Sequence, residues 1–132
     1  MNTESDNSKQ ALLVDDNATN IALASALLKK FGFVVATALD GSKAIDESKR
    51  QRFDIILMDC LMPLMDGYEA TRGIRADPGN PNTGTPIIAL TGNASEDDRD
   101  LCIASGMSDY LEKPLRPANL TDMLKKWAGY GV

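Results

Sequence analysis

Short apolar runs of strand length recur five times along the chain, and segments with helical spacing separate them. Four of the five runs are almost entirely apolar, which is typical of strands covered on both faces of a parallel sheet. Strict alternation of strand and helix predicts an α/β fold, a doubly wound parallel sheet with right-handed crossovers. The predicted strands are residues 11–14, 34–38, 55–58, 87–90 and 110–111.

Helical spacing is clearest before the second strand and after the fifth. A stripe that begins at Ile21 ends at Phe31, and Gly32 follows as a helix stop. A second stripe ends at Trp127 and follows Pro117, a residue that suits the first turn of a helix. The two stripes predict the first and the last helix.

The remaining helices are predicted from weaker patterns. Ser95, with Asp98 three residues later, is typical of a helix N-terminus. The apolar residues at helical spacing in this segment are Leu101, Ala104 and Met107. The other segments are candidate helices at 41–50 and 67–76 and a surface loop at 77–85, which is rich in Pro and Gly.

The length of 132 residues suits one packed domain. Residues 1–9 are polar and aperiodic, so we expect a flexible tail or linker there, a folded domain over 10–128 and a short C-terminal tail at 129–132. No apolar run approaches the roughly 20 residues that span a bilayer, and the N-terminus lacks a signal-peptide core. We therefore expect a cytoplasmic protein with no membrane insertion of this chain.

Charge and residue types narrow the chemistry. The net charge of −5, without a basic stretch, argues against direct nucleic-acid binding. The chain has no histidine, which excludes His-based acid–base catalysis, imidazole metal ligands and a phosphohistidine of its own. Cys60 and Cys102 lack the spacing of a metal or redox pair and are expected to be small buried residues. The chemistry that remains is that of side-chain oxygen atoms.

Three aspartates follow apolar strands. Asp15 and Asp16 come directly after the first strand, and Asp59 after the third. Ligands of such folds bind at the carboxyl ends of the strands, where these side chains should converge. Close carboxylates raise one another's pKa unless a cation neutralises them, and oxygen ligands alone suit Mg²⁺ or Mn²⁺. One such Asp would more often be a helix cap, but three together favour a metal site.

A hydroxyl and an ammonium extend the acidic cluster. Thr91 ends the fourth predicted strand, and Lys113 follows the fifth. A carboxylate can attack phosphorus to give an aspartyl phosphate while a metal and a lysine neutralise the phosphoryl oxygens. Alone, Thr91 would be an ordinary strand residue and Lys113 a surface ion pair. Beside the three aspartates, Thr91 and Lys113 predict an anion site.

Four motifs resemble those of the receiver domains of response regulators. They are LLVDDNATN, IILMDCLMPLMDGYEAT, IIALTGNA and YLEKPL, in the order and at the spacing of the family, over essentially all of 10–127. The resemblance implies that Asp59 accepts a phosphoryl group. It also implies that Mg²⁺ is bound directly by Asp16 and the backbone carbonyl of Leu61, and through water by Asp15.

The same resemblance assigns roles beyond the metal. Thr91 is implied to be the switch hydroxyl and Lys113 the phosphate-binding lysine. Tyr110, which would otherwise be assigned to the core, matches the switch aromatic, and Pro114 is implied to follow Lys113 through a cis peptide bond. The implied fold is flavodoxin-like, with five helices and the strand order 2-1-3-4-5.

The motifs are most similar to those of receivers in hybrid sensor kinases and phosphorelays. The implied function is regulatory, not enzymatic: a phosphoacceptor of two-component signal transduction that takes its phosphoryl group from the phosphohistidine of a histidine kinase or a His-containing phosphotransfer domain. The chain could be attached to a larger hybrid kinase. We expect the partner to dock beside residues 18–21, with Ile21 and Ala22 in the contact, and at the loop around Pro63. Met62 and Met65 either offer that partner a soft apolar surface or simply pack the loop.

Leu61 bears on how long the phosphorylated state lasts. Its side chain cannot hold the water that hydrolyses an aspartyl phosphate, and Asn93 is the remaining polar candidate. Slow self-dephosphorylation is therefore expected.

Other classes of protein share this architecture. A pseudo-receiver that works without phosphorylation would be favoured by loss of an acid, of Thr91 or of Lys113, and none is lost. A flavin electron carrier would want a loop rich in hydroxyls and glycine where Asp15 and Asp16 stand. A phosphatase with an Asp nucleophile would want a second acid at Leu61.

Overall fold

The computed structural model describes residues 8–92 and 95–129, which form five parallel strands and five helices. The strands are β1 (Gln10–Val14), β2 (Val34–Ala38), β3 (Ile55–Asp59), β4 (Ile87–Thr91) and β5 (Asp109–Glu112). The helices are α1 (Ala18–Lys30), α2 (Gly41–Arg50), α3 (Gly67–Ala76), α4 (Glu96–Ser105) and α5 (Pro117–Trp127). The sheet has the order β2-β1-β3-β4-β5. This confirms the predicted doubly wound fold and its strand order.

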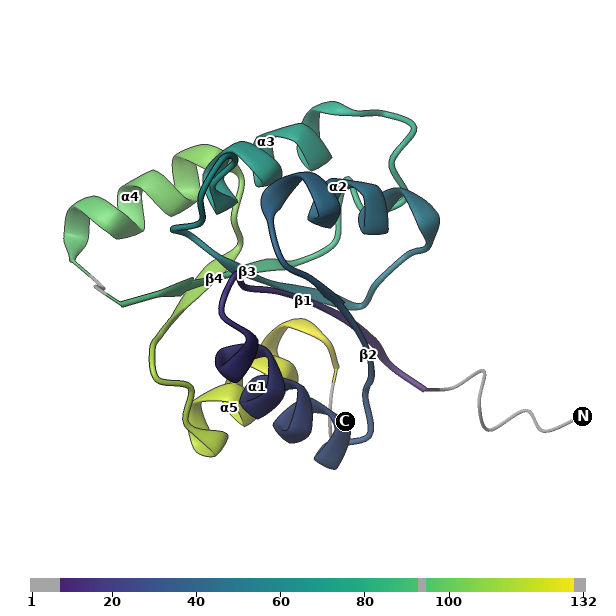
Figure 1. Cartoon of the computed structure of the whole chain (residues 1–132), viewed down its shortest axis with the longest axis vertical. Helices are drawn as coiled ribbons and strands as arrows, with labels where there is room; N and C mark the ends of the chain where they lie inside the picture. The colour runs from purple at the N-terminus through teal and green to yellow at the C-terminus, as the bar shows by residue number, and fades with distance from the viewer. Residues whose placement is uncertain (1–7, 93–94, 130–132) are drawn as a thin grey trace, which may run out of the picture.

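The sheet separates two layers of helices, each with its own core. Helices α1 and α5 cover one face, and α2, α3 and α4 cover the other (Figure 1). Side chains of β3 alternate between the two cores. Ile55 and Leu57 pack with α1 and α5, whereas Ile56 and Met58 pack on the face of α2, α3 and α4. Burial on both faces is the reason why this strand reads as a continuous apolar run.

The second strand departs from that expectation. Burial on both faces was predicted from its apolar run, but β2 lies at an edge of the sheet, and Val34 is 49% exposed. An edge strand has one neighbour, so less of its surface is covered. The apolar run correctly predicted that β2 is a strand. The prediction that both of its faces are buried is wrong.

The helix boundaries follow local chemistry. The Asn17 side chain caps α1 by accepting hydrogen bonds from the backbone N–H groups of Thr19 and Asn20. Gly32, with φ of +89°, adopts the left-handed conformation just after the helix. Ser95 caps α4 as predicted, since its side chain accepts from the N–H of Asp98.

The apolar spacing predicted for α4 is wrong. Leu101 is 46% exposed and Ala104 is also exposed, and the buried residues of the helix are Cys102 and Ser105. Met107 is buried, but it lies beyond the end of the helix. The small residues Cys102 and Ser105 carry little hydrophobic signal, so the pattern was read one residue out of phase.

The loop at 77–85 contains more than the predicted surface turn. Asn80, Asn82 and Thr85 are buried within it. The Asn82 amide nitrogen donates to the carbonyls of Ser48 and Gln51, at 2.6 and 2.8 Å. Its oxygen accepts from the N–H of Phe53 at 2.7 Å and from the Thr85 hydroxyl at 2.9 Å. This network joins the loop to the end of α2 and the start of β3.

Most of the two predicted tails, 1–9 and 129–132, lies outside the described residues. Of the part that is described, Lys9 is tied to the sheet, since its carbonyl accepts a hydrogen bond from Val34 at 2.8 Å. Across the described helices, none is long and apolar enough to cross a membrane.

Candidate functional site

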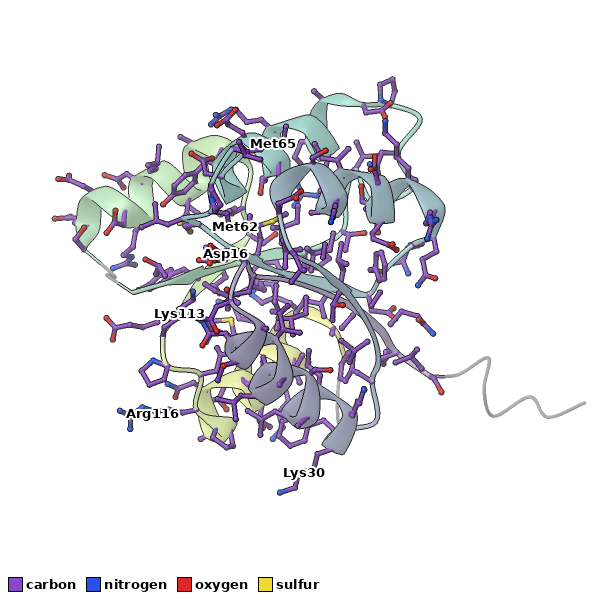
Figure 2. The ribbon with its side chains drawn as sticks, in the orientation of Figure 1. Asp16, Lys30, Met62, Met65, Lys113 and Arg116 are labelled. Atoms are coloured by element: carbon purple, nitrogen blue, oxygen red, sulfur yellow. The ribbon has the colours of Figure 1, made fainter. Side chains whose placement is uncertain are left out.

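Three carboxylates meet at the edge of the sheet where the strands end. One oxygen from each of Asp15, Asp16 and Asp59 lies within 4.8 Å of the others. Asp15 and Asp59 are 2% and 4% exposed, while Asp16 faces solvent. Asp16 and Lys113 lie near each other in Figure 2, beside the start of α1. The predicted convergence of the acids is therefore present.

Local backbone structure holds the acids in place. The Asp15 carboxylate accepts a hydrogen bond from the N–H of Asn17 at 2.9 Å, which fixes it against the start of α1. The Asp59 carboxylate accepts from the N–H of Leu61 at 3.4 Å. Behind Asp59, Gly67 packs so tightly that a Cβ on it would lie 2.2 Å from the Asp59 carbonyl oxygen. The role of Gly67 could not be predicted from the sequence, because only the tertiary packing reveals the close approach.

Lys113 bridges two of the acids. Its Nζ lies 3.1 Å from Asp59 Oδ1 and 3.3 Å from Asp15 Oδ2. Its N–H donates to the Thr91 carbonyl at 2.7 Å, which ties the end of β5 to the end of β4. The peptide bond between Lys113 and Pro114 is cis. The amine predicted from sequence thus lies in the acidic cluster.

The charges in the cluster do not cancel. Burial raises the pKa of Asp59, the hydrogen bond and charge of Lys113 oppose the rise, and the charge of Asp15 adds to it. Burial alone would lower the pKa of Lys113, but its hydrogen bond to Asp59 and the charges of Asp59 and Asp15 outweigh burial and raise it. The raised pKa of Asp59 is thus mainly an effect of burial with Asp15 adding to it, whereas the raised pKa of Lys113 reflects the two buried acids beside it.

The other predicted residues surround this cluster. Thr91 is buried at the end of β4. Leu61 is 77% exposed beside Asp59. Tyr110 is half-buried on β5 and pairs with Ala89, two residues before Thr91, so it lies in the same strand pair as Thr91 but farther from the ends of the strands. Asn93 lies outside the described residues.

The loop after Asp59 carries exposed aliphatic side chains, although its methionines pack inward. Met62 is buried in the core and Met65 packs against it; in Figure 2 Met62 lies just above the sheet and Met65 lies higher, at the level of α3. The packing favours the alternative that Met62 simply packs the loop, while Met65 is half-buried. Pro63 is exposed and Leu64 is 98% exposed, so the apolar surface of this loop belongs to other residues than the methionines.

Comparison with known proteins identifies the family. The model of the response regulator receiver domain matches residues 11–125. The chain therefore belongs to the response regulator receiver domain family. It is 38% identical over 128 residues to hybrid signal transduction histidine kinase B of Dictyostelium discoideum, a match that covers 89% of this chain and 6% of that protein.

Solved structures agree with this assignment. The receiver domain of sensor histidine kinase PA1611 from Pseudomonas aeruginosa PAO1 is 45% identical, with a TM-score of 0.84 over 92% of this chain and 98% of that one. That structure has a magnesium ion coordinated in its active site cleft. The receiver domain of Saccharomyces cerevisiae Ssk1, solved with the histidine phosphotransfer protein Ypd1, is 28% identical, with a TM-score of 0.83 over 92% and 90% of the two chains.

The donors in this chain fit a magnesium ion. Mg²⁺ prefers oxygen ligands and is commonly held by one or two carboxylates, with water and phosphate completing its shell. Asp15, Asp16 and Asp59 supply such oxygens within a few ångströms of one another. A divalent cation would also favour the ionised form of Asp59, which burial and the charge of Asp15 disfavour. The chain has no histidine to favour a softer metal.

Proposed function

We propose that residues 10–128 act as a phosphoacceptor domain that takes a phosphoryl group onto Asp59 with Mg²⁺ and changes conformation in cytoplasmic signal transduction. The observation that carries the proposal is the buried Asp59 carboxylate, with Lys113 Nζ at 3.1 Å inside a cluster of acids. An ordinary buried ion pair consists of one lysine and one carboxylate, and two further carboxylates would not be needed to neutralise the lysine. Membership of the receiver family supports the same role.

The chemistry is an in-line transfer. A carboxylate oxygen of Asp59 attacks phosphorus, a new O–P bond forms, and the bond from phosphorus to the donor breaks, leaving its electron pair on the donor. Lys113 neutralises phosphoryl oxygens that approach its ammonium. Asp15, Asp16, Asp59 and the Leu61 carbonyl would hold Mg²⁺, which supplies charge neutralisation to the transferring group.

Labelling with acetyl phosphate and Mg²⁺ tests the assignment by intact mass. We expect a gain of one phosphoryl group in the wild type and in Asp46→Asn, a matched change at an exposed acid of α2. Asp59→Asn should abolish the gain. Chelation of the metal or Asp16→Ala should suppress it, because the incoming phosphoryl charge then meets uncompensated carboxylates. Labelling that persists in Asp59→Asn, or in chelator, refutes the proposal.

The phosphorylated state should alter the surface made by α4 and α5. In this proposal Thr91 is drawn toward the phosphoryl group and Tyr110 shifts inward, biasing two pre-existing states. Thr91→Ala should accept a phosphoryl group but lose the spectral change that follows labelling. If the spectral change survives in Thr91→Ala, Thr91 does not couple the site to that surface.

A phosphohistidine domain is the proposed natural donor, and the complex of Ssk1 with Ypd1 supports this class of partner. A cavity of about 270 Å³ lies between α1 and the segment after β5. Its walls include Leu23, Leu27 and Leu115, and it reaches Lys113 and Asp15. An apolar groove that opens onto the acceptor site suits a docked helix whose histidine must reach Asp59.

Ala22 provides the sharper docking test, because it is exposed while Ile21 packs partly against the core. Ala22→Asp should slow transfer from a protein donor and leave labelling by acetyl phosphate unchanged. Ala118→Asp, at an exposed position of α5, is the matched control and should affect neither reaction. Equal slowing of both reactions by Ala22→Asp would mean that this face has no docking role.

The proposed domain is a regulator with a slow self-dephosphorylation rather than an enzyme that turns over a substrate. Leu61 is exposed beside Asp59 but can neither donate nor accept a hydrogen bond, so it cannot align the attacking water. Leu61→Asn and Leu61→Glu should shorten the lifetime of the phosphorylated protein in Mg²⁺. If neither change accelerates the decay, residue 61 does not limit it.

A further inference from the structure

Helix α4 is attached to the rest of the protein mainly through its second half. Its buried residues, Cys102 and Ser105, both lie there. At the same end, Arg75 of α3 donates from Nε to the Gly106 carbonyl at 3.0 Å and from Nη1 to the Thr83 carbonyl at 2.8 Å. The bond to Gly106 fixes the C-terminal end of α4, and the bond to Thr83 holds Arg75 against the loop before β4.

The first half of α4 has a contact of another kind. All side chains of residues 96–101 are exposed or half-exposed. From this half, the guanidinium carbon of Arg99 lies 5.2 Å from the centre of the Tyr110 ring. That distance is within the range of a cation–π interaction, in which the positive charge is attracted to the face of the ring.

Tyr110 lies on the face of the sheet that also carries Thr91. It pairs with Ala89 in the sheet and packs against the core between the sheet and helices α2, α3 and α4. Because side chains alternate along a strand, Thr91 lies on the same face as Ala89. The residue of β4 that pairs with Tyr110 is therefore small, with only a methyl group as its side chain. In the structure the ring contacts Arg99, and the inward shift of the proposed function would carry it over Ala89 toward Thr91.

We propose that Arg99 is a positioning residue that holds the Tyr110 ring outward and thereby opposes the phosphorylated conformation. This inference rests on the proposed function for the inward shift of Tyr110, and adds the residue that sets the balance between the two ring positions. Inward movement of the ring breaks the cation–π contact. The guanidinium is then released to solvent on α4, one turn before the exposed Ile103.

The size of the effect follows from the strength of the contact. An exposed cation–π pair changes an equilibrium by about two- to five-fold. A ligand or modification that favours one state is in turn favoured by that state, since the coupling is reciprocal. Removing the cation should therefore raise the inward population of Tyr110 by a factor of about two to five, and should raise the extent of phosphorylation at limiting acetyl phosphate by at most that factor.

The experiment compares Arg99→Met, which keeps an apolar chain of similar length, with Arg99→Lys, which keeps the positive charge. Ring signals of isotope-labelled tyrosine report Tyr110 by NMR, and Tyr110→Phe assigns them among the three tyrosines of the chain. In the unphosphorylated protein, Arg99→Met should move the Tyr110 signals toward those of the phosphorylated wild type, and Arg99→Lys should restore most of the outward position. Arg72→Met, at an exposed position of α3, should leave them in place.

Two outcomes separate this inference from the proposed function. Unchanged Tyr110 signals in Arg99→Met, or equal shifts in Arg99→Met and Arg99→Lys, overturn the role of the Arg99 charge. If the wild type does not label at Asp59, or labels without a movement of the ring, the proposed switch fails instead. The unphosphorylated variants still decide in that case whether Arg99 holds the ring, because their signals do not depend on labelling.

Discussion

The sheet has one edge where its strands begin and another where they end. Both of these edges bury polar side chains, but they differ in net charge. At the edge where the strands end, Asp15 and Asp59 are buried with Lys113 between them. At the opposite edge, Asn80 and Asn82 are buried in the loop before β4. Hydrogen bonding does not distinguish the edges, since no buried side-chain polar atom in the described part of the chain lacks a partner. Charge distinguishes the two edges, because the buried amides are neutral, whereas the acids of the other edge outnumber its lysine.

That difference separates stability from function. A neutral buried group whose hydrogen bonds are all made stabilises the fold and has nothing further to bind. A cluster with excess negative charge gains by binding a cation, and a cation there would neutralise the oxygens of a phosphoryl group that is transferred to a carboxylate. We therefore expect changes at the amide edge to alter stability, and changes at the acidic edge to alter chemistry more than stability.

Asn82→Ala should have the largest effect and tests the amide edge. It removes an amide that makes four hydrogen bonds, and leaves the carbonyls of Ser48 and Gln51 and the N–H of Phe53 without that partner. We expect a loss of about 4 kcal/mol in the free energy of unfolding, measured by urea denaturation. Asn119→Ala, on the exposed side of α5, should change it by less than about 0.5 kcal/mol.

The rate of labelling sharpens the same comparison. Under conditions where Asn82→Ala is folded, acetyl phosphate should label it as it labels the wild type, because the amide network is at the far end of the sheet. A folded Asn82→Ala protein with greatly reduced labelling would show that the two edges are not independent.

Gly67→Ala should come second and tests the packing behind the acceptor. The added Cβ would lie 2.2 Å from the Asp59 carbonyl oxygen and 2.9 Å from Met58 Cγ, so the backbone of β3 or α3 must shift. We expect a loss of about 2–3 kcal/mol in urea denaturation, together with slower labelling, because Asp59 moves with its backbone.

Gly73 on the same helix is the matched control for Gly67. A Cβ at Gly73 would lie 2.9 Å from Ile45 Cδ1, the end of a flexible side chain that can turn away. Replacing a helix-interior Gly by Ala gains up to about 1 kcal/mol of helix stability, which offsets the crowding. Gly73→Ala should therefore be near neutral. Equal losses in the two variants would mean that Gly67 has no special relation to Asp59.

Much of this arrangement could be predicted from the sequence, because it depends on local order. Asp15 and Asp59 come where apolar strands end, and parallel strands bring such residues together without further information. The buried role of Asn82 could not be predicted, since its partners are up to 34 residues away and an Asn among Pro and Gly is typical of a surface turn. Gly67 and Arg99 were missed for a related reason. Their contacts cross between elements, and neither residue type signals the contact it makes.

The smallest expected effect is that of Asp59→Asn on the free energy of unfolding. It is the most discriminating prediction, because this substitution should stabilise the protein, whereas most substitutions of buried residues destabilise it. Asp59→Asn keeps the shape of the side chain and removes one negative charge, which relieves repulsion with Asp15 but gives up attraction to Lys113. Burial first, and Asp15 in addition, leave the pKa of Asp59 raised in the folded protein, so the ionised form is disfavoured there relative to the unfolded chain. The Asn variant should therefore be more stable than the wild type at neutral pH, by on the order of 1 kcal/mol.

The pH dependence provides the check on that sign. A carboxyl group with a raised pKa contributes its full stability below the unfolded value of 3.8 and loses it as pH rises through the higher folded value. The advantage of Asp59→Asn should thus be absent in acid, grow as pH rises above 3.8 and level off once Asp59 is ionised in both states. Added Mg²⁺ should reduce the stability advantage of Asp59→Asn, since the cation stabilises the wild-type cluster more than that of the variant. Urea denaturation across this range measures the difference, with Asp46→Asn as the exposed control. A variant less stable than the wild type at neutral pH would mean that Lys113 fully compensates the acids, and that the acidic edge is balanced in the same way as the amide edge.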